Sequence, residues 1–171
     1  MKSTGVVRRI DELGRIVIPK EIRRNLGIHD GENVEIFTDS DSIILKKHYR
    51  MRSNLELASS LCELIYNNFN YEIIITDREK IISTAGFTDE IINKKLTIEF
   101  LNIIENRETI EKTEYSFNLE DINIQGNFIF IPIISLNDSI GLVIIKYTNE
   151  SNAPVSIGKL IASIFAKKLD I

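Results

Sequence analysis

Basic side chains are concentrated near the start of the chain, and most of them are arginines. A guanidinium stays charged at neutral pH and offers a planar fork of N–H donors, so it can clamp a phosphate or read the O6 and N7 atoms of guanine. Surface ion pairs with Asp11, Glu12 and Glu21 are an alternative use, although exposed pairs contribute little to stability. The spacing alone favours neither use. The candidate nucleic-acid contacts are Arg8, Arg9, Arg15, Lys20, Arg23 and Arg24.

The charge of the chain is divided unevenly along its length. The 171 residues have a formal net charge of -4. Residues 1–53 hold 11 Lys+Arg and 8 Asp+Glu, a balance of +3, whereas residues 54–171 hold 10 and 17, a balance of -7. A basic segment joined to an acidic one concentrates any attraction for phosphate at one end of the molecule.

The basic segment, residues 1–53, is predicted to be rich in strands with one short helix. Pro19 suits the first position of a helix, where its missing N–H costs nothing, and Gly27 suits the residue that ends it. So short a segment buries little core and has no disulfide or metal to stabilise it, so it must either dimerise or pack on the rest of the chain. The predicted elements are strands over 5–10, 16–18, 33–37 and 42–47, a tight loop over 11–15 and a helix over 19–26.

A second domain is predicted over residues 54–171. It opens with a linking helix over 54–69, at whose start Ser53 and Glu56 can form a capping box. Two later runs are nearly continuously apolar, as in strands that are buried on both faces. The pattern indicates an α+β domain with a central antiparallel sheet and flanking helices. The remaining predicted elements are strands over 72–76, 80–84, 113–119, 127–134 and 139–147 and helices over 88–95, 97–106 and 156–169.

The stretch STGVVRRIDELGRIVIPKEIRRNLGI, followed by ENVEIF and IILKKH, resembles the AbrB family of swapped-hairpin transcription regulators. The resemblance covers about residues 3–48. It implies that two chains interleave their hairpins into one β-barrel-like homodimer, which binds double-stranded DNA through arginines on one face. Arg9 stands at a position that is often lysine in the family. The positions that match the family's DNA-contacting arginines are Arg8, Arg15, Arg23 and Arg24.

The second domain is similar to GAF domains through NYEIIITDREKIISTAG and FIFIPIISLNDSIGLVIIKY. Within the AbrB family, such a domain joined through a helix implies a regulator of sporulation genes in an endospore-forming bacterium. It also implies a homotetramer, in which the N-terminal domains and the GAF-like domains each pair. A small-molecule ligand of the GAF-like domain stays open, because Phe87, Phe117 and Phe128 can either line a pocket or belong to the core.

No motif for catalysis, a cofactor or a metal is recognised in the sequence, so an enzyme is not expected. His29 and His48 lie far apart and do not have the spacing of zinc ligands, and Cys62 falls on an apolar helical stripe, as a buried structural thiol does. There is no apolar run long enough for a transmembrane helix and no signal peptide at the start, so a cytoplasmic protein is expected.

Two other functions are compatible with the sequence. Antidotes of toxin–antidote pairs also use a swapped-hairpin N-terminal domain. They usually carry a flexible tail where this chain has a second domain with regular apolar periodicity. A small-molecule sensor with minor DNA binding is the second alternative. Ligand binding by the purified protein would distinguish the sensor from a regulator that acts mainly through DNA.

Overall fold

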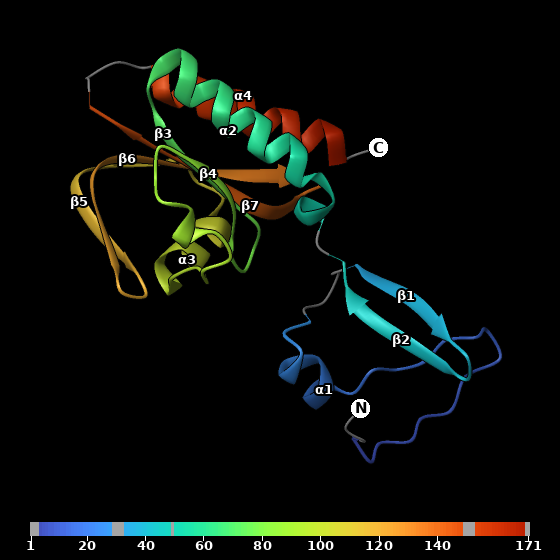
Figure 1. Cartoon of the computed structure of the whole chain (residues 1–171). Coiled ribbons are helices and arrows are strands. Elements are labelled where there is room, and N and C mark those ends of the chain that lie inside the picture. Colours follow the sequence, from blue (N-terminus) through green and yellow to red (C-terminus); the bar gives the residue numbers. More distant parts are fainter. Residues whose placement is uncertain (1–3, 29–32, 49, 149–152, 170–171) are drawn as a thin grey trace. The chain divides into compact units, whose positions relative to one another are not determined.

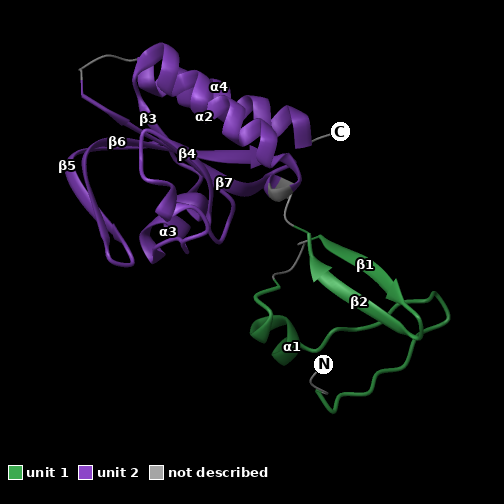
Figure 2. Cartoon of the chain, in the orientation of Figure 1, with its two compact units in different colours: residues 1–48 green, residues 49–171 purple. Residues whose placement is uncertain are grey.

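The computed structural model separates two units, which we call the head, residues 1–48, and the body, residues 49–171 (Figure 2). The 3-10 turn η1, Arg50–Asn54, contributes Met51 to the core of the body. Because Met51 packs in this core, η1 belongs to the body. The predicted domain boundary after residue 53 concerns which segments fold independently, and it stays a prediction. The structure describes residues 4–28, 33–48, 50–148 and 153–169.

The head consists of one short helix and one hairpin (Figure 1). Helix α1, Lys20–Asn25, begins one residue later than predicted, because Pro19 keeps an extended backbone and acts as the N-terminal cap. The chain leaves α1 through Gly27, whose φ of +61° favours glycine. Strands β1, Val34–Asp39, and β2, Ser42–Lys47, pair in antiparallel register around the turn at Ser40.

The strands predicted over 5–10 and 16–18 do not form within one copy of the chain. The described residues 4–18 contain no strand. An extended segment becomes a strand only when a neighbouring segment exchanges backbone hydrogen bonds with it, and the only sheet of the described head is the pair β1–β2. The prediction of these two strands is therefore wrong for the isolated chain.

The body is built on a five-stranded antiparallel sheet (Figure 1). Its order is β4-β3-β7-β6-β5, so the last strand of the chain lies at the centre. This arrangement confirms the predicted α+β class with a central antiparallel sheet. The strands are β3, Glu72–Thr76; β4, Ile81–Ala85; β5, Ile110–Leu119; β6, Ile122–Ser135; and β7, Asp138–Tyr147.

Helices cover both faces of this sheet, as Figure 1 shows. Helix α2, Leu55–Phe69, and helix α4, Ala153–Leu169, pack on one face around Cys62, Ile161 and Phe165. Helix α3, Ile98–Asn106, covers the other face, where Phe100 meets Phe117 edge to face with ring centroids 4.9 Å apart. Each face thus has its own apolar core, which explains why the central strands are apolar on both sides.

Three details of the predicted helices are wrong. The capping box of Ser53 and Glu56 does not form, since α2 follows η1 directly and its cap, Asn54, makes no side-chain hydrogen bond to the helix. The helix predicted over 88–95 is reduced to the 3-10 turn η2, Asp89–Ile91, because Asn93 takes a φ of +68° and bonds to the edge of the sheet at Ile81. Helix α4 starts earlier than predicted.

Cys62 is a structural residue of the first core. Its side chain is fully buried beneath α2, and burial raises the pKa of its thiol to about 12. A thiol with so high a pKa is almost entirely protonated at neutral pH and is a poor nucleophile. Among the described helices, none is long and apolar enough to cross a membrane.

Gly141 is expected to be the most substitution-sensitive glycine of the sheet. A Cβ at this position would lie 2.1 Å from the backbone oxygen of Thr76, so strands β3 and β7 would have to separate. We expect Gly141→Ala to lower the free energy of unfolding of the body by about 1–3 kcal/mol, the usual effect of overpacking. Urea denaturation followed by circular dichroism measures this difference.

Ser139→Ala, two residues away on the same strand, is the matched control. The Ser139 hydroxyl is buried and has no hydrogen-bond partner among the described residues. Removing an unsatisfied hydroxyl should leave stability unchanged or increase it. Equal destabilisation by both substitutions would contradict the steric explanation for Gly141.

Candidate nucleic-acid interface

Helix α1 carries three of the predicted contacts, Lys20, Arg23 and Arg24. Lys20 and Arg24 are exposed and Arg23 is half-buried. Local backbone hydrogen bonds close both ends of the helix: the Arg23 N–H donates to the Pro19 carbonyl at 3.0 Å and the Ile28 N–H donates to the Arg23 carbonyl at 2.8 Å. The two arginines in its last turn also suit the negative end of the helix dipole.

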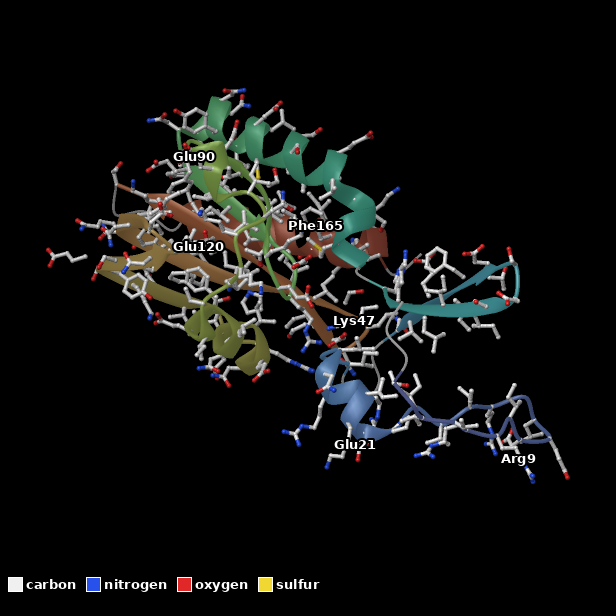
Figure 3. All side chains as sticks on the ribbon, turned by 60° about the horizontal axis from the view of Figure 1, so that its bottom comes forward. Arg9, Glu21, Lys47, Glu90, Glu120 and Phe165 are labelled. Carbon is white, nitrogen blue, oxygen red and sulfur yellow. The ribbon has the colours of Figure 1, made fainter. Side chains whose placement is uncertain are left out.

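The hairpin holds this helix through Lys47. The Lys47 ammonium on β2 donates a hydrogen bond of 2.7 Å to the Gly27 carbonyl, just past the end of α1. Figure 3 labels Lys47 close to the helix. This role of Lys47 could not be predicted from the sequence, since no local pattern connects two residues that lie 20 positions apart.

Arg15 lies in a loop that Asp11 closes. The Asp11 carboxylate accepts hydrogen bonds from the N–H groups of Leu13, at 3.0 Å, and Arg15, at 2.8 Å. Its second oxygen lies 2.7 Å from Nε of the Arg15 guanidinium. These contacts lower the pKa of Asp11, chiefly through the backbone N–H of Arg15 and next through its guanidinium. An ion pair of Asp11 with an arginine, one of the two uses considered from the sequence, is therefore present. Arg15 remains exposed in this pair, so it can also contact DNA.

Arg8 and Arg9 lie on the extended segment before this loop. Both side chains are exposed, and Arg8 donates to the carbonyl of the preceding residue, Val7, at 3.3 Å. Figure 3 shows Arg9 directed away from the ribbon. The six predicted residues thus occupy α1, the loop and the extended segment, and five of them are exposed.

The head lacks a buried core in the part of the chain that the structure describes. None of its described side chains is buried. One face of the hairpin is mostly apolar, because the register places Ile36 opposite Leu45, with Val34 and Ile43 on the same side. Thr38 and Lys47 share this face. Ile36 remains 65% exposed and Ile43 70% exposed, so the described residues of one chain leave these two side chains largely uncovered.

Among its described residues, the body has open hollows at two places. One hollow, of about 420 Å³, lies at the β5–β6 hairpin beside Tyr115 and Gly126, and the other, of about 490 Å³, lies between the start of α2 and Lys168. Phe117 and Phe128 are buried in the second core, and Phe87 packs against it. The described residues contain no cluster of three or more potential metal ligands, and His29 lies outside them.

Comparison with known proteins separates the same two units. The family model described as stage V sporulation protein T C-terminal, transcription factor, matches residues 55–170. The model described as antidote-toxin recognition MazE, bacterial antitoxin, matches residues 7–53. The body also resembles the GAF domain from an Acinetobacter phosphoenolpyruvate-protein phosphotransferase, with a TM-score of 0.54 at 10% identity over 70% of this chain and 90% of that one. That likeness shows a GAF-like fold.

Two curated relatives come from Bacillus subtilis. The transition state regulatory protein AbrB is 60% identical over 48 residues, which cover 28% of this chain and 50% of the relative. Stage V sporulation protein T is 36% identical over 153 residues, which cover 85% of this chain and 84% of the relative. Since that similarity extends through both units in the same order, the chain belongs to the family of stage V sporulation protein T.

Proposed function

We propose that this protein is a DNA-binding transcription regulator of sporulation genes, which acts in the cytoplasm at the nucleoid and is not an enzyme. The observation that carries the proposal is the exposed basic surface of the head, in a segment 60% identical to a transition state regulator. Guanidinium groups on a fixed helix and a closed loop can contact phosphates and guanine edges together. The contacts are Arg8, Arg9, Arg15, Lys20, Arg23 and Arg24.

The DNA-binding unit in this proposal is a homodimer of heads with interleaved hairpins. A two-stranded hairpin is at best marginally stable in water on its own. A second head can cover the apolar face around Ile36 and Ile43, and full burial of one such side chain is worth about 1.5–3 kcal/mol. The extended segments over 5–10 and 16–18 would also gain strand partners from the second chain.

The body joins two such dimers into a homotetramer in the same proposal. Most of the apolar stripe on α2 and α4 covers the sheet, and Ile161 is 1% exposed. Leu64 on α2 and Leu160 on α4 nevertheless remain 56% and 62% exposed. Helices with apolar outer faces commonly pair across a two-fold axis, and pairing would raise DNA affinity through effective concentration. A small-molecule ligand of the body could change how the bodies pair, but the proposed tetramer does not require one.

An antidote is the second candidate, because the MazE model matches residues 7–53. That match is confined to the head and η1, whereas the body matches the stage V sporulation protein T model over 55–170. A sensor with minor DNA binding is the third candidate, and the GAF-like fold of the body is the feature that favours it. The regulator accounts for both units and is the function that we adopt.

Substituting Arg8, Arg15, Arg23 or Arg24 by alanine is expected to weaken DNA binding without unfolding the protein. Each loss should be about tenfold or more at about 150 mM salt. A dimer presents two copies of these four arginines, and if about half of them neutralise phosphates, the log–log salt slope should be roughly -3 to -4. Fluorescence anisotropy with a labelled duplex at several salt concentrations measures both quantities.

Lys167→Ala, an exposed change at the end of α4, is the control for this series and should leave affinity unchanged. An affinity that does not respond to salt would show that the arginines do not contact phosphates. An equal loss with Lys167→Ala would show that the effect is not specific to the head.

Ile43→Glu in the full chain is expected to abolish DNA binding, although Ile43 lies on the hairpin and not among the basic residues. A carboxylate on the apolar face would have to be buried between two heads, at a cost of several kcal/mol. Asp41→Ala, on the adjacent turn, leaves the apolar face intact and should retain binding. Full affinity of the Ile43→Glu protein would contradict the paired-head arrangement.

Leu160→Glu is expected to convert the tetramer to a dimer that still binds DNA. The carboxylate would disrupt pairing of α4 with its copy, while the core beneath the helix stays intact. Leu136→Glu is a matched control, since Leu136 is 65% exposed and lies in the β6–β7 turn and not on a helix. Sedimentation equilibrium measures the mass, and a wild-type chain that is already dimeric would refute the tetramer.

A further inference from the structure

The loop over residues 11–15 is exposed, yet several hydrogen bonds hold its conformation. The Asp11 N–H donates to the Arg15 carbonyl at 3.1 Å, and the Gly14 N–H donates to the Asp11 carbonyl at 2.9 Å. The Asp11 carboxylate adds the two backbone contacts and the guanidinium contact described above. Gly14 takes a φ of +74°, a conformation that favours glycine. One carboxylate thus organises both the loop backbone and the side chain of Arg15.

The contact between Asp11 and Arg15 contributes little to the stability of the fold. The side chains of Arg15 and Asp11 are 71% and 42% exposed, and exposed ion pairs add little to the free energy of unfolding. The contact instead restricts where the guanidinium points. Asp11 engages the Nε edge of the group, so the two terminal nitrogens remain available as a fork. A fork held in advance loses less conformational entropy when it meets a ligand.

We infer that Asp11 is a positioning residue, which fixes the Arg15 fork so that it reads a base edge and increases discrimination between DNA sequences. The inference rests on the proposed function of the head. A carboxylate beside the DNA-binding arginines also repels phosphates generally, so it lowers affinity for every sequence. Because this repulsion acts on every sequence alike, it does not change the ratio of affinities. Asp11 raises that ratio through the Arg15 contact, which only the specific sequence provides.

Asp11→Asn in the full chain distinguishes positioning of the Arg15 guanidinium from a purely structural role in holding the loop backbone. The amide oxygen of asparagine can still accept from the N–H groups of Leu13 and Arg15, so the loop keeps its backbone contacts. The negative charge that holds Nε is lost. Glu12→Gln is the matched control, because it removes the same charge from the adjacent exposed residue.

The measurement is the ratio of two affinities, for a duplex that the wild-type protein enriches from a random pool and for a scrambled duplex of equal composition. We expect Asp11→Asn to lower this ratio by about fivefold or more, with weaker binding to the enriched duplex and stronger binding to the scrambled one. Glu12→Gln should change the ratio less than twofold. In an Arg15→Ala background, Asp11→Asn should leave the ratio unchanged, because the group that Asp11 positions is gone.

Two outcomes would overturn the inference while leaving the proposed function intact. The first is an unchanged ratio for Asp11→Asn in the wild-type background. The second is an equal fall in the Arg15→Ala background, which would show that Asp11 acts on the loop and not through Arg15. A wild-type protein that enriches no duplex would overturn the proposed function itself, and this inference with it.

Discussion

An antiparallel hairpin of two strands has two faces, and an apolar face that nothing covers must lie against water. The head of this protein has a mostly apolar face on which the described residues leave Ile36 and Ile43 exposed, and none of its described side chains is buried. Its internal ties are local and polar, such as the Lys47 contact to Gly27 and the Asp11 contacts to the loop. In the proposed arrangement a second chain supplies the missing cover, and the basic surface acquires a defined shape only as a result.

The body is built in the opposite way. Its sheet is covered on both faces by helices of the same chain, and even its thiol, Cys62, is part of the packing. The body has its own cores, whereas the described head has none. This difference agrees with the proposed roles, in which the body joins chains into a tetramer and the paired heads bind DNA. The balance of +3 over residues 1–53 and of -7 over residues 54–171 agrees with these roles, because it favours phosphate at the N-terminal end of the chain.

Sequence patterns predicted the elements that local physics determines. The β1–β2 hairpin, the helix that ends at Gly27 and the α+β class of the body follow from turn residues and apolar periodicity. The central place of β7 could not be predicted, because strand order depends on packing between distant segments. The strands predicted over 5–10 and 16–18 are absent from the described chain, and in the proposed dimer a second chain would supply their partners. The six basic residues, and Asp11 as an ion-pair partner, were visible from the sequence. That the Asp11 carboxylate binds both the loop backbone and Arg15 could be seen only from distances.

The dependence of the head on a second copy is the central claim, and the residue 1–53 fragment tests it directly. Analytical ultracentrifugation at micromolar concentration, together with thermal unfolding at several concentrations, gives its mass and its cooperativity. The account predicts a folded dimer whose unfolding midpoint rises with protein concentration, because association and folding are then one equilibrium. A folded monomer, with a midpoint that does not depend on concentration, would contradict it.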